Sequence, residues 1–289
     1  MSRTRSLGRI LHKIAEDESP EKKPSVAEEL NKACAGGVTS VGAFSVLGIK
    51  RKLKSLLKNL ESDDFNRDKF FTEFNHLYRL VMAPDKRAKG VFHPSQLMDG
   101  CSRQMAYDLL GTTPSDLVTR PISAELQRTF DVGTWYHIYT QSILYEIGIL
   151  EQAEVPVVNK KKYLNGKADG VFKKEFYGKK VVLEIKTMNN WNFTKAVFQP
   201  FKKHEFQASL YARELGIDSV LYLYINKDTS EIREFLRPVN KEMLELADKK
   251  MNKVIEHVEN GTLPPRRACT DRFCDNAMAC PFASLCFKE

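Results

Sequence analysis

The spacing of apolar residues along the chain predicts an alternation of strands and helices. Short apolar runs rich in β-branched residues predict strands at residues 154–158, 166–172, 180–187, 219–226 and 231–237. Apolar positions at helical spacing predict helices at residues 65–82, 94–110, 123–150, 201–215 and 241–260. This order of elements predicts an α/β domain, a mixed sheet flanked by helices.

The first 90 residues have a different character from the rest of the chain. Residues 1–30 are polar and charged, which is typical of a flexible leader. Residues 49–60 predict an amphipathic helix whose basic face is either solvated or in contact with a polyanion. We therefore expect a basic, partly flexible helical N-terminal extension (1–90), followed by one main domain (91–289) with a cysteine-rich tail (264–289).

The predicted strand at 180–187 is apolar until it carries two charges. Glu184 and Lys186 are two residues apart, so their side chains point to the same face of the strand. Burying such charges costs free energy unless they have partners. A divalent cation held by Asp169 and Glu184 would compensate for that cost, with Lys186 beside a reacting water. The alternative is a surface hairpin with a solvated acid and an ordinary ion pair.

Hydrolysis of a phosphodiester needs these residue types. A hard cation polarises the phosphoryl group and lowers the pKa of the attacking water. Carboxylate oxygens are the ligands that Mg²⁺ and Mn²⁺ prefer. A neighbouring lysine can orient the water or stabilise charge that develops in the transition state.

Four short motifs follow one another in an order that is typical of one nuclease family. They are G-x-x-x-H at 133–137, G-x-x-D at 166–169, E-x-K at 184–186 and Q-x-x-x-Y at 207–211. With them, residues 91–289 resemble the RecB-type branch of the PD-(D/E)XK nucleases. The resemblance implies a restriction-endonuclease-like sheet. It also implies a metal held by His137, Asp169, Glu184 and the backbone carbonyl of Ile185, catalysis by Asp169, Glu184 and Lys186, and DNA contacts from Gln207 and Tyr211.

Composition agrees with a polyanionic partner. The 289-residue chain has a formal net charge of +8 and a pI near 9.0, although a soluble protein can also be basic without such a partner. The first residues lack the apolar core of a signal peptide, and no run approaches the length of a membrane span. We therefore expect a cytoplasmic, intracellular protein with reduced cysteines and no membrane partner. A free-standing nuclease of this size also fits a viral origin.

Cysteines are concentrated at the end of the chain. Four of the six are Cys269, Cys274, Cys280 and Cys286, and Cys101 lies well upstream. This layout resembles the iron–sulfur subset of the same family, in which one upstream and three downstream thiolates hold a [4Fe–4S] cluster. The resemblance implies Cys101, Cys274, Cys280 and Cys286 as ligands, with Cys269 as the alternate, because Ala277 stands where the middle cysteine is expected. A zinc site of the four tail cysteines, or free thiols, are the alternatives.

These observations predict a DNA nuclease that depends on Mg²⁺ or Mn²⁺ and carries a structural [4Fe–4S] cluster. By resemblance the expected activity is that of an exonuclease on single-stranded DNA or duplex ends. The alternatives are a structure- or site-specific endonuclease, and a non-catalytic DNA-binding module with a zinc or iron–sulfur tail. The chain has no nucleotide-binding P-loop, so unwinding driven by ATP would need a separate helicase or recombination partner.

Overall fold

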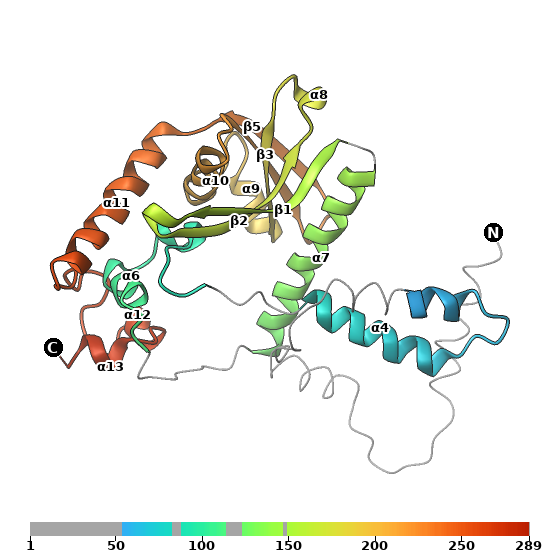
Figure 1. The fold of residues 1–289 in the computed structure, drawn as a ribbon, viewed down its shortest axis with the longest axis horizontal. Helices are drawn as coiled ribbons and strands as arrows, with labels where there is room; N and C mark the ends of the chain where they lie inside the picture. The colour runs from blue at the N-terminus through green and yellow to red at the C-terminus, as the bar shows by residue number, and fades with distance from the viewer. Residues whose placement is uncertain (1–53, 83–87, 114–122, 147–148, 289) are drawn as a thin grey trace, which may run out of the picture.

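The chain folds around one mixed five-stranded sheet. The computed structural model describes residues 54–82, 88–113, 123–146 and 149–288. The strand order is β1-β2-β3-β4-β5, with β3 and β4 parallel and the other neighbours antiparallel (Figure 1). The strands are β1 (Leu150–Asn159), β2 (Leu164–Phe172), β3 (Val181–Met188), β4 (Ser219–Asn226) and β5 (Ile232–Pro238). The predicted α/β class, a mixed sheet flanked by helices, is therefore confirmed.

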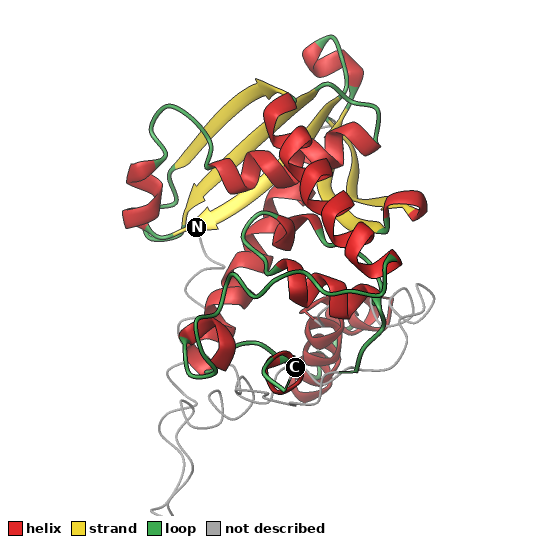
Figure 2. Cartoon of the chain, turned by 90° about the vertical axis from the view of Figure 1, so that its left-hand side faces the viewer, coloured by secondary structure: helices red, strands yellow, loops and turns green. Residues whose placement is uncertain are grey.

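Helices surround the sheet and account for most of the remaining described chain (Figure 2). The longer ones are α4 (Arg67–Met82), α6 (Ser102–Leu109), α7 (Ala124–Glu146), α10 (Lys202–Glu214) and α11 (Lys241–Glu259). Short ones are α5 (Pro94–Leu97), η1 (Lys160–Lys162), α8 (Lys174–Tyr177), α9 (Asn190–Lys195), α12 (Asp275–Met278) and α13 (Ala283–Cys286). Residues 54–60 are also helical. The rest of the predicted helix at 49–60, the predicted leader and the sixth cysteine, Cys34, which we interpret as an ordinary thiol, lie outside the described residues.

The two faces of the sheet have separate cores, because side chains alternate along each strand. On β3, Leu183 and Ile185 belong to the cluster that packs against α7. Val182, on the opposite face, belongs to the cluster formed with α9 and α10. Figure 1 accordingly shows α7 and α10 on opposite sides of the sheet. The alternation places Glu184 and Lys186 on the α10 face.

A third cluster joins the start of the main domain to its end. Leu97 and Ala106, from α5 and α6, pack with Leu210 of α10 and with Ala247 and Met251 of α11. The α11 helix is capped by Asn240, whose side chain accepts a hydrogen bond from the backbone N–H of Met243 at 3.2 Å. Residues far apart in sequence thus form one support beneath the sheet.

The predicted helix boundaries needed two corrections. The helix expected at 94–110 is interrupted between α5 and α6, where a Cβ at Gly100 would lie 2.3 Å from the carbonyl oxygen of Gln96. The helix expected at 123–150 ends at Glu146, and Leu150 already begins β1. The short helix α9 was not predicted, since six residues offer too little periodicity. In the described part of the chain, no helix is both long and apolar enough to cross a membrane.

Replacing Leu210 with alanine should test the third cluster. Leu210 is fully buried, so its loss removes contacts and leaves a cavity, and we expect a loss of about 2–5 kcal/mol of unfolding free energy. Leu246→Ala on α11 is the control: Leu246 is 51% exposed, and the expected change is within about 0.5 kcal/mol. Urea unfolding monitored by circular dichroism measures both, and equal losses would contradict this account of the core.

Candidate active site

The hydrogen-bonded ladder between β2 and β3 stops at the two acidic residues. Its register covers only Gly170–Leu183, Val171–Val182 and Phe172–Val181. Asp169 and Glu184 come directly beyond the last pair. There the side chain of Asp169 replaces the missing backbone partner, because its Oδ2 accepts a hydrogen bond from the N–H of Ile185 at 2.6 Å. The acids therefore lie at a fork between two strands.

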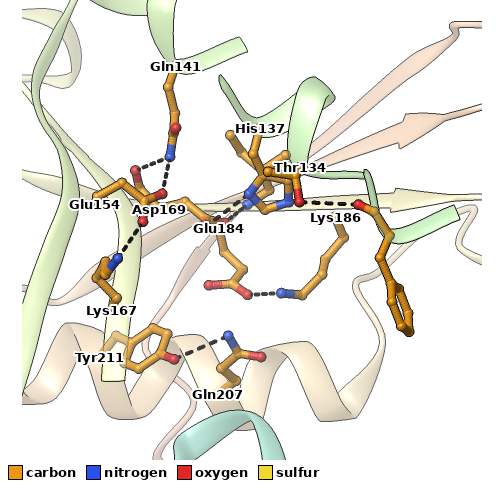
Figure 3. A network of polar contacts seen from close by, with 12 residues as sticks. Thr134, His137, Gln141, Glu154, Lys167, Asp169, Glu184, Lys186, Gln207 and Tyr211 are labelled. Atoms are coloured by element: carbon orange, nitrogen blue, oxygen red, sulfur yellow. Dashed lines mark hydrogen bonds and ion pairs between the residues drawn. The ribbon is translucent and has the colours of Figure 1, made fainter. Parts of the chain in front are cut away.

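Glu184 is a buried carboxylate with incomplete compensation. It is 1% exposed, and its Oε1 forms an ion pair with the ammonium of Lys186 (Figure 3). Its Oε2 is buried and has no hydrogen-bond partner among the described residues. An unpartnered buried carboxylate oxygen costs free energy. Further positive charge beside Glu184 would therefore be stabilising.

The ionisation of this pair reflects the same conflict. Burial raises the pKa of Glu184 to about 7, although the charge of Lys186 acts to lower it. Burial by itself would lower the pKa of Lys186, but the Glu184 and Asp169 carboxylates outweigh burial and raise it. Lys186 therefore remains an ammonium, and a cation near Glu184 would favour its carboxylate form.

His137 reaches the fork from α7. Its Nδ1 lies 3.2 Å from Oδ1 of Asp169. Burial opposes the charge on both groups, yet their mutual hydrogen bond and attraction lower the pKa of Asp169 and raise that of His137. The predicted motif residues His137, Asp169, Glu184 and Lys186 thus form one charged cluster, assembled from α7, β2 and β3.

Two polar residues that were not predicted support this cluster. Gln141, one turn after His137 on α7, donates from Nε2 to the backbone oxygen of Asp169 at 2.9 Å and to Oε1 of Glu154 at 2.8 Å. Glu154 also pairs with Lys167 at 3.1 Å. The backbone of Glu154 has φ of 52°, a left-handed conformation that costs on the order of 1–3 kcal/mol in a residue other than glycine. The i, i+4 spacing from His137 could have indicated Gln141, whereas the left-handed backbone of Glu154 has no sequence signal here.

Gln207 and Tyr211 line the site from α10. Gln207 Nε2 donates to the hydroxyl of Tyr211 at 3.4 Å, and Figure 3 shows both side chains below Glu184. Burial, reinforced by the charge of Glu184, raises the pKa of Tyr211, so its hydroxyl stays protonated. A Cβ at Gly166 would lie 2.7 Å from Cε1 of Tyr211. The G-x-x-D and Q-x-x-x-Y motifs are therefore in direct contact.

A pocket of about 600 Å³ opens beside Lys186. Its lining includes Asn189, Asn192, Lys203, His204 and Lys227. Nδ1 of His204 hydrogen-bonds the hydroxyl of Tyr224 at 2.6 Å. Burial, reinforced by the charges of Lys186 and Lys203, lowers the pKa of His204 to about 3, so this histidine is neutral and contributes packing and polarity rather than charge. No sequence motif singled out His204.

The donor set suits a hard divalent cation. In the described ranges no three His, Cys, Asp or Glu side chains already form a group arranged to hold a metal. His137 instead contacts Asp169, and Glu184 contacts Lys186. The unpartnered Oε2 of Glu184, close to the half-buried carboxylate of Asp169, nevertheless provides the oxygen chemistry that such a cation requires. The predicted role of the Ile185 carbonyl stays a prediction.

The cysteines gather at a second site, away from the sheet. A cavity of about 250 Å³ is lined by Cys101, Cys269, Cys280 and Cys286. The tail is held against α6 by stacking of Tyr107 on Phe282, whose ring centroids are 5.2 Å apart. The structure thus brings the upstream cysteine together with the tail.

Cys274 lies at the edge of this group rather than in the cavity lining. It precedes α12, and its sulfur accepts a hydrogen bond from the Cys269 thiol. A backbone hydrogen bond from Ala277 leads the interactions that lower the pKa of Cys274, whereas burial raises the pKa of Cys269 to about 11. The predicted ligands and the cysteines that line the cavity therefore differ at one position: Cys274 was predicted, and Cys269, its hydrogen-bond partner, lines the cavity.

Replacing Gly166 with alanine should disturb Tyr211 directly. The added methyl group would overlap the Tyr211 ring, so we expect a loss of about 1–3 kcal/mol of unfolding free energy. In a Tyr211→Ala background the same substitution should cost clearly less, because the overlapping ring is gone. Urea unfolding of the four proteins measures this coupling. Equal costs in both backgrounds would show that the contact does not constrain residue 166.

Comparisons with known proteins gave matches to solved structures only. No family model matches the chain, and no curated protein matches it. The chain is similar to an alkaline exonuclease (LHK-Exo) from Laribacter hongkongensis in complex with dAMP, with a TM-score of 0.46 and 13% identity over 60% of this chain and 89% of that one. It is also similar to a protein designated SSO0001, with a TM-score of 0.44 and 16% identity over 75% of this chain and 96% of that one.

Proposed function

We propose that this chain is a metal-dependent deoxyribonuclease that hydrolyses phosphodiester bonds. The observation that carries the proposal is the strand fork, where Asp169, Glu184 and Lys186 meet and Oε2 of Glu184 is buried without a partner. A purely structural ion pair does not need a second, half-buried carboxylate beside it, because that carboxylate adds to the electrostatic cost. A catalytic cation explains both acids.

Asp169, Glu184 and His137 would hold Mg²⁺ or Mn²⁺, with the Ile185 carbonyl as a further ligand. When bound, such an ion polarises the phosphoryl group and lowers the pKa of a nearby water. His137 and Asp169 already restrict each other's orientation through their 3.2 Å contact. Gln141 fixes the backbone of Asp169 from the same helix. These contacts position the donors before any ligand arrives.

Lys186 supplies the positive charge of the reaction itself. Its ammonium is held by Glu184 on the pocket side of β3, where it orients the attacking water and stabilises charge on the phosphoryl oxygens. The Tyr211 hydroxyl and the Gln207 amide lie on the facing helix and can donate to the bound strand. The lysines around the pocket attract phosphates.

The substrate class follows from the resemblance of the motifs rather than from the geometry. We propose exonuclease action on single-stranded DNA or duplex ends, with any unwinding supplied by a separate helicase or recombination partner. Structure- or site-specific endonuclease action is the alternative. Digestion of end-labelled DNA, with each end blocked in turn, distinguishes these activities.

We further propose that the cysteine cavity holds a structural [4Fe–4S] cluster. Each thiolate of such a cluster binds a different iron, so the ligands surround a volume instead of converging on one point. A cavity of about 250 Å³ lined by four cysteines fits this requirement. A single zinc ion instead needs four ligands within about 2.3 Å of one centre. Zinc is the alternative occupant of this site.

The catalytic assignment predicts distinct losses for two variants. Glu184→Gln should abolish cleavage of DNA and also remove stabilisation by Mn²⁺, because it eliminates a charged ligand while retaining side-chain volume. Lys186→Met should lower the cleavage rate about 10²- to 10³-fold, the scale for losing one transition-state donor. Gel assays of cleavage and thermal unfolding with and without Mn²⁺ measure the two effects.

Lys179→Met is the matched control for Lys186. Lys179, just before β3, forms an exposed ion pair with Asp218, and the Lys179→Met variant should cleave DNA at the normal rate. If both active-site variants cleave DNA normally, the nuclease assignment is wrong. A DNA-binding module with a structural tail would then be the better account.

The cluster proposal predicts a brown protein when purification excludes oxygen. Iron and acid-labile sulfide should be present, and Cys286→Ser should lose both together with thermal stability, because the cluster ties the tail to α6. Cys269→Ser and Cys274→Ser decide the fourth ligand: the ligand variant loses iron and the other retains it. Cys34→Ser is the control and should keep the colour. A colourless anaerobic preparation with stoichiometric zinc would refute the iron–sulfur assignment.

A further inference from the structure

The segment that follows β3 is held rigidly at both ends. The backbone N–H of Asn190, at the start of α9, donates to Oδ2 of Asp228 at 2.7 Å. Arg233 of β5 donates to the carbonyl oxygens of Phe193 and Ala196 at 3.0 and 2.7 Å. Arg237 donates to the carbonyl oxygen of Phe198 at 2.9 Å. We call residues 189–198 the α9 platform.

The α9 platform exposes two aromatic rings despite this anchoring. Trp191 is 69% exposed and Phe198 is 84% exposed, while Phe193 between them is buried. The ammonium of Lys195 lies 4.5 Å from the centroid of the Trp191 ring. Lys195 therefore covers part of the ring, and the rest of the ring is exposed. Two large exposed rings on one anchored ten-residue segment favour a binding role.

The platform adjoins the pocket beside Lys186. Asn189 and Asn192, which flank Trp191 in sequence, line that pocket. The pocket also contains Lys203 and Lys227, and no ion pair of the described residues includes either of them. Asp228, an acid in the lining, accepts a hydrogen bond from the N–H of Asn190, and the three lysines of the lining outnumber it. The surface therefore combines positive charge with exposed aromatic area.

We propose that the α9 platform is a binding subsite for an unpaired DNA strand, in which a base stacks on Trp191 and the lysines of the adjoining pocket bind its phosphates. This inference rests on the proposed nuclease function and names the substrate form that the site accepts. Base stacking on aromatic rings combined with a positively charged groove is the usual mode of single-strand binding. Bases in a closed duplex are already stacked, so their faces are not available to the ring.

Charge and chemistry favour a nucleic-acid occupant over a protein partner. A protein interface of ordinary size has a continuous apolar core. Here the two exposed rings lie beside a pocket that is lined mainly by lysines and by asparagine and threonine side chains. Phe198 ends the same anchored segment, seven residues beyond Trp191.

Trp191 reports its own occupancy. The chain has two tryptophans, and Trp135 stacks on Tyr78. In a full-length Trp135→Phe protein with EDTA, single-stranded oligothymidylate should quench the fluorescence of Trp191 with the same midpoint as binding measured by anisotropy. Trp191→Ala should weaken binding of this oligonucleotide about 5- to 100-fold, the scale of losing one base stack. Trp191→Phe should retain most of the affinity.

The controls separate stacking from general effects. Phe273→Ala removes a comparably exposed ring, 79% exposed, in the tail and should not change binding. Blunt duplex DNA should bind the Trp191→Ala and parent proteins alike. Equal weakening for single-stranded and duplex DNA, or no weakening for either, would overturn the subsite. A shift from dimer to monomer in Trp191→Ala with unchanged DNA binding would instead identify a contact between two copies of the chain.

The failures of this inference and of the proposed function are distinguishable. If oligonucleotide quenches Trp191 but no Mg²⁺ or Mn²⁺ condition gives cleavage, the subsite holds and the nuclease proposal fails. If the parent protein cleaves DNA and Trp191→Ala binds single strands normally, the nuclease proposal holds and the subsite fails.

Discussion

The burial of Glu184 at the end of the β2–β3 ladder is the constraint on which the rest of the site depends. Inside a protein, a carboxylate that lacks partners costs several kcal/mol, and here Lys186 compensates only one oxygen. The strands cannot continue pairing, because Asp169 takes the N–H of Ile185 with its side chain. At the fork, backbone hydrogen bonds between β2 and β3 are absent, and the charged cluster around Asp169 and Glu184 takes their place. The elements that pack around it hold this cluster in place.

Each face of the sheet contributes a different part of that support. His137 and Gln141 approach Asp169 from α7, whereas Gln207 and Tyr211 approach Glu184 from α10. The alternation of side chains along β3 makes this division possible, since apolar residues anchor the strand to α7 while the charges face α10. The sheet thus separates the residues that contact Asp169 from the residues beside Glu184 that we propose contact the substrate.

Much of the fold could be predicted, because apolar spacing reports burial and burial largely determines the elements. All five predicted strands are present, although β1 begins at Leu150, four residues earlier than predicted. The motif residues meet because Asp169, Glu184 and Lys186 lie on neighbouring strands. Gln207 and Tyr211 are four residues apart and therefore share one face of α10. Three features had no such signal: the left-handed backbone of Glu154, the short helix α9, and the choice between Cys269 and Cys274. Each depends on contacts between distant parts of the chain, which local periodicity does not encode.

The connection from β3 to α9 gives the site its direction. Lys186 and Trp191 are five residues apart, and Met188 between them is buried in the core. The backbone N–H of Lys227 donates to the Met188 carbonyl at 2.8 Å, which ties the connection to the end of β4. A strand that stacks on Trp191 would therefore present its phosphates to Lys186 at a separation set by covalent geometry and one hydrogen-bonded turn. Fixed spacing of this kind is what positions a substrate for in-line attack without further movement of the protein.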